Sequence, residues 1–240
     1  HTIDGSNSNR LFKISGNNVT LKNINFINTK CNYRGGAIYC YGDGCSLVNC
    51  SFVNTKSYKY GGAVFFEYNS SVLNCSFVNC YSSEGGGAIY FMFARGIVSN
   101  CNFVNCSTGN TGGAISSEWE NGIVSNCSFV NCFASNAGGA INIDYTYNCI
   151  VSYCSFVNCS ASDDGGAINW MSDTGAINYN IFDNNVTSKS SAIETMNPID
   201  CDFNFFAFED TVASFPKGLV KGSTVNNWVV LNISEDNVDY

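Results

Sequence analysis

The sequence repeats itself about every 26 residues along most of its length. Two markers define the repeat, the tripeptide Phe-x-Asn and the tetrapeptide Gly-Gly-Ala-Ile or Gly-Gly-Ala-Val. The Phe of the first marker recurs at Phe26, Phe52, Phe77, Phe103, Phe129, Phe156 and Phe182. The first Gly of the second marker keeps the same register, at Gly35, Gly61, Gly86, Gly112, Gly138 and Gly165. A fixed period of this size is typical of a solenoid built from stacked units.

The residues between the markers favour strands over helices. Gly-Gly interrupts every unit, and apolar residues come in short runs rich in Val, Ile, Phe and Tyr, such as 88–91 and 97–104. At about 3.3 Å per residue, one unit can trace a closed lap around a narrow core, and successive laps would pair in parallel about 4.8 Å apart. We therefore expect an all-β fold, a right-handed parallel β-helix of about seven to eight laps.

The last part of the chain departs from the repeat. The period is lost after Asn197, and both prolines, Pro198 and Pro216, follow it. The open end of a β-helix exposes strand edges and core, so solenoids cover it. We predict that 1–197 form the repeats and that 198–240 cap the same domain, leading to further modules. His1–Arg10 do not resemble a signal peptide, so we expect a mature or excised piece of a larger protein.

Stacking turns the repeat into columns of side chains. The residue five before each Phe is aliphatic in every unit, and the residue two before it is usually Cys. Together with the Phe itself, these positions predict three ladders of side chains that point inward. The Asn two after Phe predicts an internal, structural ladder, because Asn tolerates a left-handed bend and its amide can bond to the Asn of the next lap. Its members are Asn28, Asn54, Asn79, Asn105, Asn131, Asn158 and Asn184.

Nine of the fourteen cysteines fall in two columns, two residues before Phe and three residues after it. Such periodic columns suit small apolar residues that fill the same notch in each lap. Disulfides within or between laps remain an alternative, since the stacking distance lies within the range that a disulfide spans. Zinc sites gather four ligands, usually with closer Cys pairs, so we expect no metal site.

Composition limits the possible partners. The chain has 240 residues, a net charge of −8 and 12% charged residues, which makes nucleic acid an unsuitable partner. Its 45% hydrophobic residues are enough for a core, and no run approaches the roughly 20 apolar residues of a membrane span. We expect no cofactor, no membrane insertion and a monomeric domain.

Two aromatic columns follow the Gly-Gly marker and predict a surface for binding. Four residues after the first Gly come Tyr39, Phe65 and Tyr90, where later units carry polar residues, which suggests an outward position. Seven residues after it come Tyr68, Phe93, Trp119 and Tyr145. Exposed rings can stack on sugars or anchor a protein partner. The alternative is that the second column closes a corner of the core.

Catalytic signals are sparse. Asp163 and Asp164 precede Gly165 in an expected turn, and Glu67, Glu118 and Asp144 share a column that Met92 interrupts. A polysaccharide lyase or hydrolase on a β-helix, similar to pectate lyases or polygalacturonases, would need carboxylates clustered on neighbouring laps. We therefore assign no catalytic residue and expect the chain not to be an enzyme. Calcium binding by turn carboxylates stays open.

The markers themselves resemble those of known surface proteins. Gly-Gly-Ala-Ile alternating with Phe-x-Asn is similar to the passenger repeats of polymorphic outer-membrane adhesins. In those repeats the second motif is Phe-x-x-Asn, with one more residue between Phe and Asn. The segments 2–5, 14–23 and 227–232 more closely resemble archaeal adhesin-like proteins of methanogens. This resemblance covers nearly the whole chain and implies an extracellular, cell-surface module that binds surface glycans or surface proteins of other cells. A carbohydrate-active enzyme and a passive stalk are the alternatives.

Overall fold

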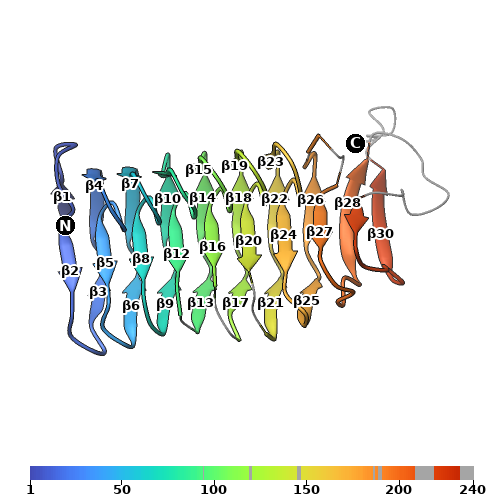
Figure 1. The fold of residues 1–240 in the computed structure, drawn as a ribbon, viewed down its shortest axis with the longest axis horizontal. Coiled ribbons are helices and arrows are strands. Elements are labelled where there is room, and N and C mark those ends of the chain that lie inside the picture. The colour runs from blue at the N-terminus through green and yellow to red at the C-terminus, as the bar shows by residue number, and fades with distance from the viewer. Residues whose placement is uncertain are drawn as a thin grey trace, which may run out of the picture.

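The computed structural model describes residues 1–93, 95–118, 121–144, 147–185, 187–188, 191–208 and 219–232. In these residues the protein is all-β, a parallel β-solenoid of about eight laps with a period of about 26 residues. Figure 1 shows the laps side by side, from the N-terminal strands at one end to β28 and β30 at the other. None of the described segments forms a helix able to cross a membrane. The predicted fold class is confirmed.

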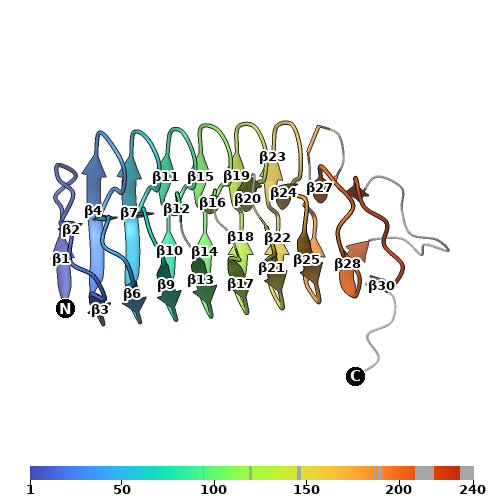
Figure 2. The same ribbon diagram turned by 60° about the horizontal axis from the view of Figure 1, so that its bottom comes forward.

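Each lap passes through three parallel sheets, here named A, B and C. One lap runs through β14 (Asn102–Val104) and β15 (Ser107–Thr108) in sheet A, then β16 (Ile115–Ser117) in sheet B and β17 (Ile123–Ser125) in sheet C. It then enters the next lap at β18 (Ser128–Val130) of sheet A. Between sheets A and B the chain makes the arch that Figure 2 shows along one edge of the molecule.

The strands of one sheet occupy equivalent places in successive laps. The other strands of sheet A are β1 (Thr2–Asp4), β4 (Asn25–Cys31), β7 (Ser51–Ser57), β10 (Ser76–Val78), β11 (Tyr81–Ser82), β19 (Phe133–Ala134), β22 (Ser155–Val157), β23 (Ser160–Ala161), β26 (Ile181–Asp183), β28 (Asn204–Phe208) and β30 (Trp228–Asn232). Those of sheet B are β2 (Phe12–Ile14), β5 (Ile38–Cys40), β8 (Val64–Phe66), β12 (Ile89–Phe91), β20 (Ile141–Asp144), β24 (Ile168–Met171), β27 (Ile193–Thr195) and β29 (Val220–Lys221). Those of sheet C are β3 (Thr20–Lys22), β6 (Cys45–Val48), β9 (Ser70–Leu73), β13 (Gly96–Ser99), β21 (Cys149–Ser152) and β25 (Gly175–Asn178).

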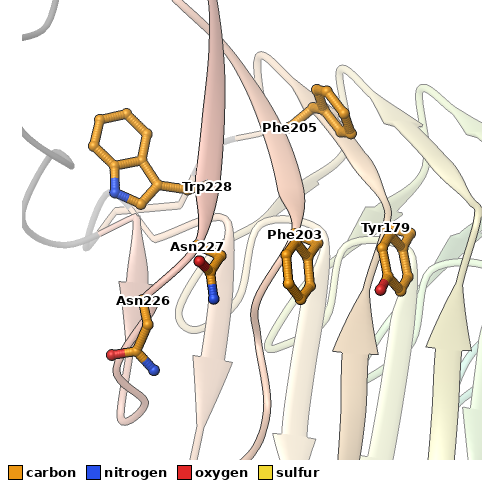
Figure 3. A pocket seen from close by; sticks show the side chains of 6 residues that line it. All are labelled: Tyr179, Phe203, Phe205, Asn226, Asn227 and Trp228. Atoms are coloured by element: carbon orange, nitrogen blue, oxygen red, sulfur yellow. The ribbon is translucent and has the colours of Figure 1, made fainter.

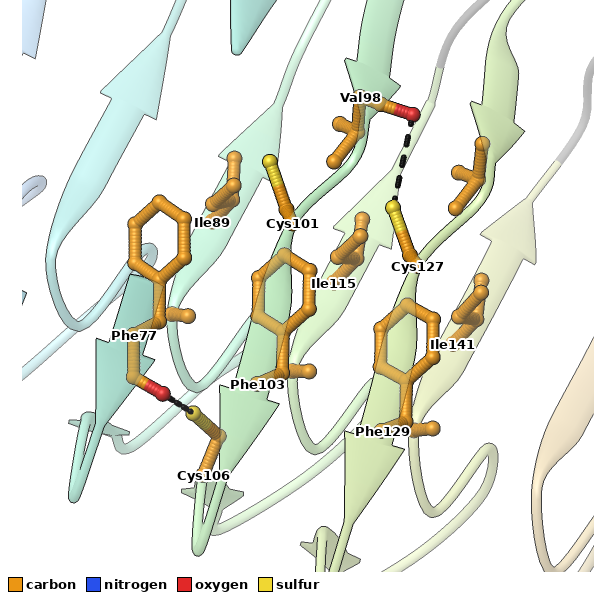
Figure 4. Packing of buried hydrophobic residues seen from close by; sticks show 14 of the residues in the cluster. Phe77, Ile89, Val98, Cys101, Phe103, Cys106, Ile115, Cys127, Phe129 and Ile141 are labelled. Carbon is orange, nitrogen blue, oxygen red and sulfur yellow. Dashed lines mark hydrogen bonds between the residues drawn. The ribbon is translucent and has the colours of Figure 1, made fainter. Parts of the chain in front are cut away.

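In-register pairing stacks equivalent residues and builds the core. Phe103 pairs with Phe129, and the rings of this column lie parallel, with centroids 4.8 Å apart and an interplanar angle of 3° for that pair. Figure 4 shows three such rings facing the Ile column of sheet B, which includes Ile115 and Ile141. The side chains of Phe103, Phe129, Ile115 and Ile141 are fully buried. The Phe ladder and the Val and Cys ladders beside it therefore point inward, as the repeat predicts.

The two cysteine columns are packing ladders of reduced thiols. In Figure 4 the Sγ of Cys106 donates to the carbonyl of Phe77 at 3.6 Å, and that of Cys127 donates to the carbonyl of Val98 at 3.7 Å. Every cysteine of the two columns is free and buried. The structure contains one disulfide among the described residues, Cys40–Cys45, which links sheets B and C outside both columns.

The Asn ladder forms, but it lies on the surface. Asn105 has a φ of 53°, its Nδ2 donates to Oδ1 of Asn79 at 3.3 Å, and Asn79 donates to Asn54 at 3.1 Å. The left-handed backbone and the lap-to-lap bonds agree with the sequence prediction. The expected internal position is wrong, because the bend turns these amides outward between an inward Phe and the next inward side chain, a Cys or Thr. Asn54, Asn79 and Asn105 are all exposed.

The glycine pairs meet two separate requirements of the arch. Gly112 has a φ of +68°, in the left-handed region that residues with a side chain rarely adopt. Gly113 lies so close to the next lap that a Cβ would stand 1.9 Å from the carbonyl oxygen of Gly139. The glycine pairs of the central laps are therefore required if one arch is to stack on the next.

The stacking continues into the segment after Asn197. Phe206 of β28 pairs with Phe182, and their rings stack at 5.2 Å, while β30 pairs with β28 and β29 pairs with β27. Residues 209–218 and 233–240 of the predicted cap lie outside the described residues. The described parts of 198–240 thus extend sheets A and B by the same parallel pairing.

Replacing Phe129 by Ala should destabilise the protein strongly. The ring is fully buried between two stacked neighbours, so its removal leaves a cavity and should lower the free energy of unfolding by about 3–5 kcal/mol in urea denaturation. Phe133 is the matched control: it is exposed, and Phe133→Ala should change stability by no more than about 0.5 kcal/mol. Equal effects of the two substitutions would contradict the assigned core.

Thiol labelling should separate Cys31 from the ladder cysteines. Cys31 is only half-buried, whereas the other free cysteines are buried. The neighbouring thiol of Cys127 raises the pKa of Cys101 to about 12, so this thiol is neutral at ordinary pH and unreactive toward iodoacetamide. Mass spectrometry should find native protein alkylated at Cys31 first and all twelve free cysteines alkylated after unfolding. Rapid native labelling of Cys101 would contradict the packing.

Candidate functional site

The aromatic column of Tyr39, Phe65 and Tyr90 is not the exposed column that the sequence predicts. Phe65 is fully buried and Tyr90 nearly so, and their rings stack on each other at 5.4 Å. The guanidinium of Arg34 lies 4.7 Å from the centre of the Phe65 ring, and the ring of Tyr60 lies 4.5 Å from that of Tyr90. The sequence prediction is therefore wrong for Phe65 and Tyr90, because side chains of the arches fold over the outer face of sheet B. Tyr39 is half-buried beside them.

The second predicted aromatic column can be followed in two laps. Tyr68 and Phe93 are exposed, as the surface hypothesis requires, but they make no ring contact with each other. Trp119 and Tyr145, which would complete that column, lie outside the described residues. The two exposed rings thus do not form a stacked platform by themselves.

The acidic column beside sheet B holds neighbouring side chains in place. Tyr39 donates to Glu67, and Tyr90 donates to Glu118 at 2.7 Å. Burial raises the pKa of Asp144, while a 2.7 Å bond from Nδ2 of Asn142 acts in the opposite direction. The carboxylates therefore serve as acceptors for the buried outer layer of sheet B.

The remaining acidic residues singled out in the sequence are Asp163 and Asp164. Asp163 is exposed and Asp164 half-buried, and they stand in the turn before Gly165. Within the described ranges, no group of three or more His, Cys, Asp or Glu side chains is placed to hold a metal ion.

An aromatic stack that the sequence analysis did not identify lies at the corner between sheets C and A. We name Tyr153, Tyr179 and Phe203 the aromatic strip. Their rings stack in sequence, with centroids 5.2 Å apart and interplanar angles of 6° at both contacts. The three residues are 61%, 43% and 45% exposed. The edges of three rings thus form one continuous apolar line on the surface.

The backbone of the aromatic strip is strained. Tyr153, Tyr179 and Phe203 have φ values of 55°, 59° and 59°, in the left-handed region where bulky residues are genuine outliers. The equivalent residue in earlier laps is always Asn, which tolerates this conformation: Asn23, Asn49, Asn74, Asn100 and Asn126. Three successive laps therefore replace a suitable corner residue with an aromatic one. This change of residue type at a fixed register was the sequence signal that could have revealed the strip.

Two hollows adjoin the aromatic strip. Figure 3 shows the first, about 430 Å³, in which Phe203 and Tyr179 lie with parallel rings while Phe205, Trp228, Asn226 and Asn227 complete the lining. The Nδ2 of Asn227 is fixed by a 2.9 Å bond to Asp202. This hollow combines ring edges with amide groups able to donate and accept hydrogen bonds.

The second hollow, about 470 Å³, adjoins the strip at Tyr153 and Tyr179, nearer the N-terminal end of the solenoid. Its lining includes Tyr153, Tyr179 and the exposed Ile181, together with the hydroxyls of Ser128 and Ser155. Contiguous exposed apolar groups rimmed by polar ones are typical of interaction sites on soluble proteins. The strip and its two hollows are therefore the best candidate for a binding surface.

The comparisons with known proteins add no assignment: no family model, no curated protein and no solved structure matches this chain.

Proposed function

We propose that this chain is an extracellular, adhesin-like module that binds surface glycans of other cells through the aromatic strip of Tyr153, Tyr179 and Phe203. The observation that carries the proposal is the use of exposed aromatic residues at three successive corners where the backbone favours Asn. Backbone strain in exposed residues is a reason to look for a function, because the fold alone does not require it.

The energetics of the strip support a role beyond folding. A left-handed backbone costs a residue other than Gly or Asn about 1–2 kcal/mol, and each stacked pair of rings returns about 0.5–1.5 kcal/mol. The strip has three such residues and two stacked pairs. Stacking therefore offsets only part of the strain, so Asn would serve the fold at least as well. A bound ligand supplies the reason to keep the rings.

The composition of the surface suits a sugar. Carbohydrates present apolar C–H faces bordered by hydroxyl groups, and aromatic side chains together with a few polar groups bind both parts. Here Tyr179 and Phe203 offer the apolar contact, while Asn226 and Asn227 lie beside them in the same hollow. The exposed Ile181 extends the apolar area toward the second hollow.

A triple substitution tests this function. Tyr153→Asn, Tyr179→Asn and Phe203→Asn together restore the corner residue of the earlier laps and relieve the backbone strain, so the free energy of unfolding should stay the same or rise. Binding on a glycan array and to cells should weaken by roughly 30-fold or more, as expected for the loss of anchoring rings. Fluorescence-monitored urea unfolding and the two binding assays measure these effects.

Phe133→Ser provides the matched control. Phe133 is an exposed ring on sheet A whose partners in the adjacent laps, Ser107 and Ser160, are already Ser. Its replacement should leave binding unchanged. If the triple variant binds as well as the unaltered protein, the strip is not the adhesive surface. If the unaltered protein binds neither glycans nor cells, a passive stalk is the better assignment.

A further inference from the structure

Positive charge is concentrated at the end of the solenoid opposite the aromatic strip. Seven of the eleven Lys and Arg residues lie in the first 60 positions, with only two of the nineteen Asp and Glu residues. The protein as a whole carries a net charge of −8. An anion is therefore attracted to the first laps and repelled by the later ones.

Two lysines stand side by side in these laps. Lys30 of β4 and Lys56 of β7 are directly opposite in the parallel register. Like charges in this position normally destabilise a sheet. The ring of Tyr58 lies 5.3 Å from Nζ of Lys30 and 4.9 Å from Nζ of Lys56, and Tyr81 lies 4.6 Å from the latter. Aromatic faces thus hold both ammonium groups, and among the described residues neither lysine forms an ion pair.

Lys30 also lines a polar hollow of about 480 Å³. Arg10 forms another part of its wall and is fixed there, because Nη2 donates to the carbonyl of Arg34 at 2.7 Å and Nε donates to that of Gly35 at 3.1 Å. None of the described residues that line the hollow carries a carboxylate. Two cationic residues therefore border the hollow, and no carboxylate among its described lining residues competes with them.

The rest of the lining suits a sugar ring. Tyr33 borders the hollow and is 67% exposed, which leaves its ring available for stacking. The amides of Asn7, Asn9 and Asn32 lie on the same lining and can bond to hydroxyl groups. An aromatic ring, several amides and a pair of cations together match one chemical class, a sugar that carries an acidic group.

We propose that this hollow binds an acidic monosaccharide unit, a uronic acid or a sulfated sugar. Lys30 holds the carboxylate or sulfate, with Arg10 and Lys56 adding to the positive potential, and Tyr33 contacts the ring. The site lies in the first laps and shares no residue with the aromatic strip. It makes the N-terminal end selective for acidic glycans.

Titration of the intact chain with small sugars tests the site. The probes are sodium D-glucuronate, D-glucose 6-sulfate, D-glucose and sodium sulfate, each followed by amide chemical shifts in NMR at low salt. Glucuronate or glucose 6-sulfate should give saturable shifts around Tyr33 and Lys30, which weaken as ionic strength rises. The two acidic sugars distinguish a carboxylate site from a sulfate site.

Charge-matched variants locate the interaction. Lys30→Gln should weaken binding of the acidic sugar roughly tenfold or more, without lowering Tm, because it also removes a like-charge contact. Lys22→Gln removes the same charge from an exposed position on β3 of sheet C and should leave affinity unchanged. The triple variant of the aromatic strip should keep its affinity for glucuronate, so failure of one site is distinguishable from failure of the other.

Four results would overturn the proposal. These are no saturable binding of either acidic sugar, equal binding of D-glucose, equal binding of sodium sulfate, and equal losses in the Lys30→Gln and Lys22→Gln variants. Equal binding of sulfate would mean a bare anion site without recognition of the sugar ring. Equal losses in both lysine variants would mean that net charge, and not this hollow, attracts the ligand.

Discussion

Backbone amides of each lap donate hydrogen bonds to carbonyls of the next lap, as Ala88 N does to Ala114 O at 2.9 Å. This pairing determines which side chains lie above one another, and the core and the surface both depend on it. Parallel strands in register place equivalent residues directly above one another, so a side chain has to suit its own copy as a neighbour. Flat rings meet this condition by stacking, thiols by filling a small notch, and asparagines by bonding amide to amide. The three inward ladders and the outer Asn ladder are all consequences of that one constraint.

The same constraint gives the surface its character. A residue type that recurs at one register becomes a continuous line, and a change of type ends that line. At the corner between sheets C and A, Asn126 is followed by Tyr153, Tyr179 and Phe203, so a polar line becomes an apolar one within a single lap. At the other end, two lysines in register produce a positive line next to a polar hollow. A solenoid can therefore carry different binding chemistries at its two ends while the core remains uniform.

The strain at the aromatic corner and the lysine pair share one physical feature. Each is locally unfavourable, the first through its backbone angles and the second through charge repulsion, and each is partly compensated by aromatic contacts. Neither is needed for stacking, because other laps use Asn or neutral residues at the equivalent positions. Features that the fold does not need are where binding is best sought, and both lie on the surface rather than in the core.

The amino-acid sequence by itself determined the period, the parallel solenoid, the inward Phe and Cys columns and the bends at Asn28 and its copies. These follow because lap-to-lap stacking converts sequence spacing directly into contact, so counting residues is enough. Only the tertiary structure decided which outward columns are covered. Tyr39, Phe65 and Tyr90 share a register that alternation alone would leave exposed, yet Arg34 and Tyr60 fold over it from the arches. The strip of Tyr153, Tyr179 and Phe203 stays open for the opposite reason: its corner bends away from the core, and the rings cover only one another.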